Sequence, residues 1–133
     1  MLRKLNTKHA GFTLVEIMIV VAIIALLASI AVPNFLRSRK RSQATHVLED
    51  LRIIDSAIDL YSIENNKSNG NTINWADVQS YIKNGTRLYM SGGNDILGNA
   101  FTIPTVENSP KVSTTTFNAL SDVAPAAFWS PYR

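Results

Sequence analysis

The stretch "EIMIVVAIIALLASIAVPNFL", residues 16–36, places one carboxylate, Glu16, directly before twenty residues without an ionisable side chain. Twenty helical residues at about 1.5 Å each extend about 30 Å, the thickness of a bilayer's hydrocarbon core. The run therefore predicts a transmembrane helix. A cleaved signal peptide ending at Ser29-Ile30-Ala31 is an alternative, but its apolar centre would exceed the usual length of about 7–15 residues and would carry Glu16. A buried core helix is a second alternative, but no later segment is apolar enough to surround it.

The helical pattern continues beyond the apolar run. After Arg37, apolar residues recur in steps of three and four, which is typical of one face of an amphipathic helix: Ala44, Val47, Leu48, Leu51, Ile54, Ile58 and Tyr61. The charged residues between them are expected to face solvent: Glu49, Asp50, Arg52, Asp55 and Asp59. We therefore expect one helix from about Thr13 to about Glu64. Pro33 removes a backbone hydrogen bond, which predicts a kink or a locally melted segment near Ser29–Pro33.

Composition narrows the range of functions. The chain has 133 residues and no cysteine, so neither a disulfide nor a thiolate metal site is available. Its net charge of +3 arises in the N-terminal head, where Arg3, Lys4 and Lys8 precede Phe12, and the remainder has ten basic and ten acidic residues. The basic balance is therefore poor evidence for nucleic-acid binding.

The C-terminal part, residues 66–133, reads as a small globular domain. "NNKSNGN", residues 65–71, predicts the end of the long helix. "NWADVQSYIKNG", residues 74–85, predicts a short helix with Asn74 as its N-cap and Trp75, Val78 and Ile82 on its apolar face. "RLYM", "AFTIP" and "KVSTTTF" are short β-prone runs, and Gly92-Gly93 lies in a turn between two of them. We expect a small antiparallel sheet covered by the apolar stripe of the long helix.

The string "GFTLVEIMIVVAIIALLASIAVPNF", residues 11–35, resembles the signal of type IV pilins and type II secretion pseudopilins. The resemblance rests on Gly11, on Phe12, on the motif Thr-Leu-x-Glu that ends at Glu16, and on the late Pro33. "DILGNAF", residues 95–101, is similar to a segment that follows the helices in major pseudopilins. The resemblance implies an α+β, pilin-like fold, with a long N-terminal helix packed on a small C-terminal antiparallel sheet. Its expected parts are a cleaved leader (residues 1–11), a transmembrane part (12–36), an amphipathic part (37–65) and the globular domain (66–133).

The resemblance also implies how the chain is processed and what it contacts. A prepilin peptidase would cleave after Gly11 and methylate the new amine of Phe12. Glu16 of an incoming subunit would then meet the Phe12 amine of a neighbour, which sets the register of a filament because an unpaired buried charge is heavily penalised. The implied partners are further copies of the chain, the peptidase, an inner-membrane assembly platform, minor pseudopilins and the membrane, with no nucleic acid. The implied location is the inner membrane, single-pass, with a cytoplasmic N-terminus and a periplasmic C-terminal domain.

The chain departs from the family in two respects. Many type IV pilins close a C-terminal loop with two cysteines, and this chain has none. Major pseudopilins commonly bind calcium through clustered acids near the C-terminus, whereas Asp122 is the only acid after Glu107. Calcium prefers six to eight oxygen ligands, so we expect no cofactor and a C-terminal loop held by apolar packing, through Phe117, Leu120, Phe128 and Trp129.

Several other features have competing interpretations. "RSRKR", residues 37–41, is a stop-transfer anchor or contacts lipid headgroups or an acidic face of the next subunit. His46 is read as a packing or surface residue, not a metal ligand. No nucleophile–base–orienting set or phosphate-binding glycine loop is found, so we expect a structural subunit and no enzyme. A membrane-anchored binding module or enzyme, and a DNA-uptake pilin, remain the alternative functions.

Overall fold

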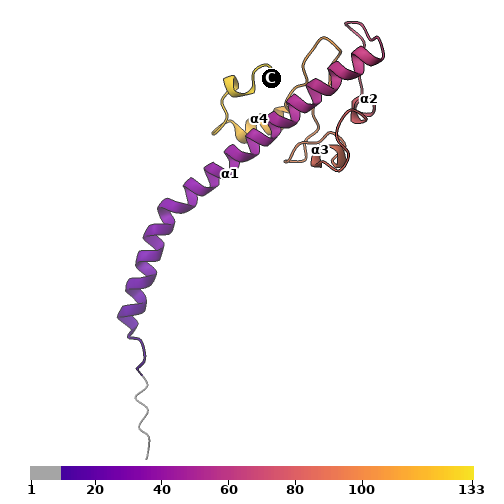
Figure 1. Ribbon diagram of the computed structural model, residues 1–133. Helices are drawn as coiled ribbons and strands as arrows, with labels where there is room; N and C mark the ends of the chain where they lie inside the picture. Colours follow the sequence, from indigo (N-terminus) through magenta and orange to yellow (C-terminus); the bar gives the residue numbers. More distant parts are fainter. Residues whose placement is uncertain (1–9) are drawn as a thin grey trace, which may run out of the picture. The chain divides into compact units, whose positions relative to one another are not determined.

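The structure is a computed structural model that describes residues 10–133. The chain divides at the junction of Leu36 and Arg37 into two compact units. Arg3, Lys4 and Lys8, which give the N-terminal head its charge, lie outside the described residues. The five elements are α1 (Leu14–Glu64), α2 (Trp75–Gln79), α3 (Arg87–Met90), α4 (Thr114–Leu120) and the 3-10 helix η1 (Ala126–Trp129) (Figure 1).

Helix α1 confirms the predicted long helix, with both ends where the sequence places them. It is unbroken through Ser29 and Pro33, so the locally melted segment is wrong, whereas a kink at Pro33 stays a prediction. The predicted apolar stripe is buried from Ala44 to Ile58, joined by Ala57, and Tyr61 packs against it. One side of the amphipathic part therefore forms the wall of the C-terminal core.

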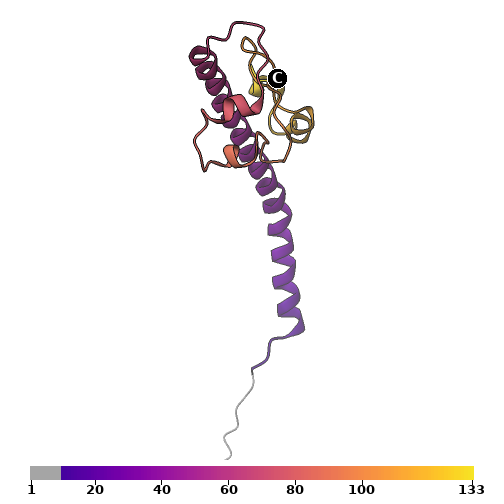
Figure 2. The same cartoon turned by 90° about the vertical axis from the view of Figure 1, so that its right-hand side faces the viewer.

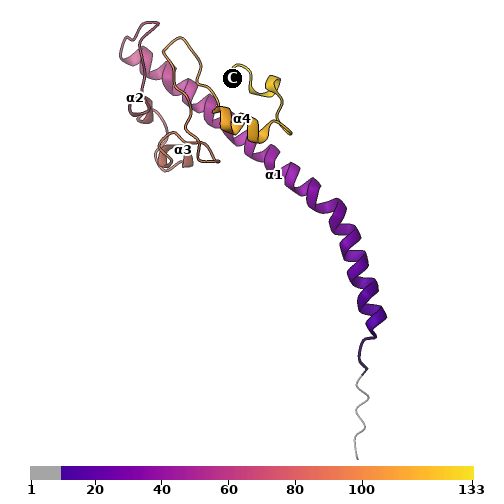
Figure 3. The ribbon, with the colours of Figure 1, turned by 180° about the vertical axis from the view of Figure 1, so that it is seen from behind.

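The C-terminal unit builds its core from that stripe and the short segments around it. Helices α2 and α3 lie on one side of α1, and α4 and η1 lie on the other (Figures 1 and 3). In the turned view the loops between them gather around the same part of α1 (Figure 2). The core residues from these segments are Ile73, Val78, Ile82, Leu88, Phe101, Val112, Leu120, Ala124, Trp129 and Tyr132.

The predicted antiparallel sheet is not found among residues 10–133. Pairing is limited to three isolated antiparallel bridges, Thr72–Thr105, Asn94–Ala100 and Thr102–Lys111. Two runs that we predicted as strands form helices. "RLYM" is α3, because the side chain of Thr86 caps it by accepting a hydrogen bond from the Tyr89 N–H at 3.3 Å. The end of "KVSTTTF" begins α4, with Ser113, a residue type preferred at that position, as its N-cap.

Helix α2 begins as predicted and ends earlier. The Asn74 N–H donates to Oδ2 of Asp77 at 2.9 Å, so the acid three residues after the cap stabilises the first turn. The helix ends at Gln79, and Val78 and Ile82 are buried in the core while Trp75 packs at its edge. Gly92 and Gly93 lie in the expected turn, with φ values of +66° and +85°. These positive angles explain why glycine stands at both positions.

Candidate functional site

Glu16 closes the first turn of α1 by bonding back to Thr13. Its Oε2 accepts from the Thr13 N–H at 2.7 Å and from the Thr13 hydroxyl at 2.9 Å. In return, the Glu16 N–H donates to the Thr13 Oγ1 at 3.2 Å. This reciprocal pattern is a capping box, which satisfies backbone donors that have no partner inside the helix. We did not predict this pair, although Thr-x-x-Glu at a helix start is its recognised signal.

The capping box leaves part of the Glu16 carboxylate available. Both Thr13 hydrogen bonds reach Oε2, and within residues 10–133 no hydrogen bond reaches Oε1. The carboxylate is therefore held in one orientation at the helix start with one oxygen open to a further donor. Phe12, which precedes the box, is 85% exposed. The Phe12 amine that we expected to pair with Glu16 is a peptide nitrogen in the described chain, so the structure does not bring that pair together.

Gly11 stands in open space. Among residues 10–133, a Cβ added there would meet nothing within 4 Å, and Gly11 is not one of the glycines with positive φ. Neither close packing nor a left-handed conformation therefore explains a glycine at position 11 in the folded chain.

Beyond the capping box, the N-terminal half of α1 is an exposed apolar surface. An 18-residue window in α1 has a mean hydropathy of 2.9, and none of it is buried within the described chain. Large exposed residues occur on every side of this half, from Leu14 to Leu36. Such an apolar surface needs lipid or other protein around it. By length and composition this helix can cross a membrane.

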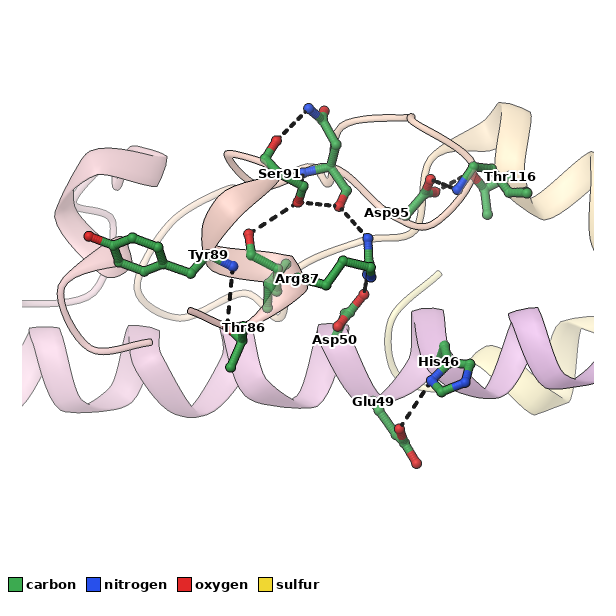
Figure 4. Close-up of polar contacts among 12 residues, drawn as sticks. His46, Glu49, Asp50, Thr86, Arg87, Tyr89, Ser91, Asp95 and Thr116 are labelled. Atoms are coloured by element: carbon green, nitrogen blue, oxygen red, sulfur yellow. Dashed lines mark hydrogen bonds and ion pairs between the residues drawn. The ribbon is translucent and has the colours of Figure 1, made fainter. Parts of the chain in front are cut away.

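In the C-terminal unit, the polar side chains serve to fix segments to one another. Arg87 of α3 forms an ion pair with Asp50 of α1 and donates to the Asn94 carbonyl at 3.3 Å (Figure 4). Burial raises the pKa of Asp50, an effect that the charge of Arg87 opposes. Asp55 is likewise half-buried and accepts from the Tyr132 hydroxyl at 3.2 Å, and burial raises its pKa too. The prediction of a fully solvated charged face is therefore wrong at these two positions, because α3 and the C-terminal end cover them.

Asp95, the acid of "DILGNAF", is a buried structural group. Its Oδ1 accepts from the N–H groups of Leu97 and Asn99 at 2.8 and 3.0 Å. Its Oδ2 accepts from the Thr116 hydroxyl, which joins this turn to α4 (Figure 4). Among residues 10–133, no group of three potential metal-binding side chains is found. His46 is exposed, and its Nδ1 lies 3.7 Å from Oε2 of Glu49. This agrees with the surface role predicted for His46.

Comparisons with known proteins bear on the N-terminal segment. Residues 6–32 match the family described as "Prokaryotic N-terminal methylation motif". The chain carries this motif. The methylation motif includes Gly11, Phe12 and Glu16, and its matched range ends one residue before Pro33.

Named relatives match less than half of this chain. A "Type II secretion system core protein G" from Aeromonas hydrophila is 33% identical over 60 residues, which cover 45% of this chain and 42% of that protein. The protein of the same name from Escherichia coli K12 is 38% identical over 58 residues, covering 44% and 40%. A "Type IV major pilin protein PilA" from Myxococcus xanthus is 44% identical over 54 residues, covering 41% and 24%.

The matches therefore span less than half of these relatives. They confirm the resemblance to type II secretion pseudopilins and type IV pilins that was read from residues 11–35. No solved structure matches the chain.

Proposed function

We propose that this chain is the structural subunit of a filament, either a type II secretion pseudopilus or a type IV pilus. The observation that carries the proposal is the methylation motif placed at the start of an exposed apolar helix, with Glu16 fixed at the first turn. The relatives named as secretion core protein G and as major pilin support it. The lack of cysteine and the "DILGNAF" segment favour the pseudopilus. The subunit acts by assembly, without catalysis of its own.

Processing is the first step of the proposed mechanism. A prepilin peptidase cleaves after Gly11, and Phe12 becomes the first residue and is N-methylated. The open space around Gly11 is consistent with this role, because no packing within residues 10–133 requires a glycine there. Before cleavage the chain is anchored in the inner membrane by residues 12–36, with its N-terminus cytoplasmic and residues 37–133 periplasmic.

Assembly is the second step, and it uses the charge that cleavage creates. The new amine of Phe12 is positive, while the Glu16 carboxylate has an open Oε1. In the apolar surroundings of a helix bundle each charge alone is costly, and pairing the amine of one subunit with Glu16 of the next offsets part of both costs. Apolar helices slide past each other easily, so this pair fixes their register. Pro33 is proposed to kink α1 and so adjust how neighbouring helices pack.

The processing step is tested by intact-mass measurement of the membrane-extracted protein. We expect a chain that begins at Phe12 and carries one added methyl group. A chain that begins at Val32 would instead identify an ordinary signal peptide. An uncleaved chain would contradict the proposed cleavage after Gly11.

The assembly step is tested by comparing three variants. Glu16→Leu and Glu16→Gln both remove the charge, and we expect normal cleavage but loss of sheared filaments in both. Thr13→Val removes the hydroxyl of the capping box and keeps the charge, so we expect it to retain filaments. Normal filaments from Glu16→Gln would exclude charge pairing, and equal loss from Thr13→Val would assign Glu16 to helix capping alone.

A further inference from the structure

A small pocket lies at the beginning of the C-terminal unit. Its volume is about 410 Å³. It is lined by Arg37, Ser38 and Arg41 of α1 and by Asp122 and Val123, which follow α4. Arg37 and Arg41 are four residues apart, so both project from the same side of the helix. The pocket therefore brings two guanidinium groups and a hydroxyl against a short turn of the C-terminal segment.

The pocket carries a net positive charge. Lys40 Nζ lies 3.0 Å from Oδ2 of Asp122, and this hydrogen bond holds the pKa of Asp122 below its ordinary value. Among residues 10–133, neither Arg37 nor Arg41 has an ion-pair partner within 4.0 Å, and the Ser38 hydroxyl has no hydrogen bond. Lys40 already neutralises Asp122, so the two remaining cations, Arg37 and Arg41, give the pocket a charge of about +2. Within this part of the chain, the guanidinium groups of Arg37 and Arg41 and the hydroxyl of Ser38 are therefore donors without an acceptor.

The position of the pocket along the chain suggests its ligand. Arg37 follows Leu36, the last residue of the apolar run, and both belong to the continuous helix α1. In a membrane-anchored subunit, residues directly after the apolar span lie at the level of the lipid headgroups. The proposed function of the chain supplies that anchoring, and the inference rests on it.

We propose that this pocket binds the phosphate group of an anionic phospholipid. Guanidinium groups bind phosphate oxygens in pairs of parallel hydrogen bonds, and the Ser38 hydroxyl adds a further donor. Val123 offers an apolar contact beside the charged groups. A zwitterionic headgroup brings its own cation toward a pocket that is already positive, so the pocket selects anionic lipids. Bound lipid would hold the subunit at the membrane surface until it enters a filament.

The test uses the full chain in a neutral maltoside detergent with equimolar phosphatidylglycerol and phosphatidylcholine. Native mass spectrometry measures the lipids retained by each variant. We expect selective retention of phosphatidylglycerol, reduced about fivefold by Arg37→Gln or Arg41→Gln, since each surface cation contributes that order of attraction. Arg39→Gln is the matched control, because it removes the same charge from a residue that does not line the pocket. It should reduce retention by less than about twofold.

A fourth variant should change binding in the opposite direction. Asp122→Asn removes the only acid that lines the pocket and releases Lys40, so we expect stronger retention of phosphatidylglycerol. A variant that merely damaged the fold would not bind lipid more tightly. Equal losses from Arg39→Gln and Arg41→Gln would show a diffuse surface charge and overturn the proposal.

Two further outcomes would also overturn the proposal. Displacement of the lipid by inorganic phosphate alone would identify a site for the free anion. Loss of cross-links between copies in membranes, with lipid retention unchanged in Arg37→Gln and Arg41→Gln, would assign the pocket to a second copy of the chain. The readout is independent of filaments, so a chain that selects phosphatidylglycerol but never assembles would refute the proposed function and leave this site in place.

Discussion

At the scale of single residues, Gly92 and Gly93 stand side by side in one turn and have different surroundings. Both have positive φ, but a Cβ at Gly93 would come within 2.7 Å of the Trp75 ring, whereas a Cβ at Gly92 would meet open space. Gly92→Ala should therefore cost about 1–2 kcal/mol for the left-handed backbone alone. Gly93→Ala should cost about 1–3 kcal/mol more, because the ring of Trp75 must move.

Thermal unfolding of both glycine variants measures the difference. One kcal/mol lowers the melting temperature of a domain of this size by about 4–8 °C, so the gap between the two variants is measurable. Equal melting temperatures would show that the ring of Trp75 can move aside without loss of stability.

At the scale of elements, the C-terminal unit depends on one face of α1. Leu51 is fully buried in that face, and Leu60, on the same helix, is 54% exposed. Leu51→Ala should destabilise the unit by about 2–5 kcal/mol, since it removes buried methyl groups and leaves a cavity. The same change at Leu60 should cost less than about 0.5 kcal/mol. Urea unfolding followed by tryptophan fluorescence compares them, and a comparable loss at Leu60 would place a second packing surface on α1.

The C-terminal end joins α1 through a pair that responds to alkaline pH. Burial of the Tyr132 phenol, and then the nearby Asp55 carboxylate, raises the pKa of Tyr132. The folded chain therefore favours the neutral phenol. This contribution to stability is complete below the ordinary value of about 10 and is lost as the pH rises through the higher folded pKa.

Melting temperatures between about pH 9 and about pH 11 test this pair. The original chain should lose stability over that range, and Tyr132→Phe should lose less, because its ring cannot ionise. Tyr89→Phe is the control, since among residues 10–133 the Tyr89 hydroxyl has no carboxylate partner. Parallel pH profiles for all three chains would exclude Tyr132 as the group responsible.

The elements also show what the sequence determines and what it leaves open. The bounds of α1 and its buried stripe are predictable because a helical period repeats over many turns, and local errors average out. The run that forms α3 has only four residues, too few for a helical period to show. We therefore predicted a strand from its composition and overlooked the cap that Thr86 provides. The Thr13–Glu16 box was readable from its Thr-x-x-Glu spacing, but the resemblance implied the Phe12 amine as the partner of Glu16. Asp50 and Asp55 were misjudged because their burial depends on segments far away in the chain.

At the scale of the whole molecule, the division at Leu36 and Arg37 predicts that residues 37–133 fold without the apolar span. A chain that begins at Arg37 should be soluble, folded and monomeric, because the exposed apolar surface is removed and the core is kept. Sedimentation and circular dichroism check this, and a tight oligomer would place the main assembly surface in the C-terminal unit.

The same shortened chain tests the role of calcium. The C-terminal loop is held by buried Leu120 and Trp129, with the Trp129 Nε1–H donating to the Ala124 carbonyl at 3.1 Å, and Phe117 and Phe128 pack beside them. This packing is against helices and not against the sheet that we expected. Because hydrogen bonds from the protein already occupy both oxygens of Asp95, we expect calcium and chelator to give the same melting temperature. A rise of about 10 °C, as expected for a ligand at a hundredfold excess over its Kd, would contradict this.

The continuity of α1 has a mechanical consequence. From Leu14 to Glu64 one helix is continuous, and its backbone hydrogen bonds lie along its axis. In a filament of such subunits, tension along the axis passes from helix to helix. Residues 65–133 branch from α1 and pack along its side, so they are not in series with that load. Pulling would then separate subunits, where the proposed pair of Glu16 and the Phe12 amine would resist sliding, before it unfolded the C-terminal unit.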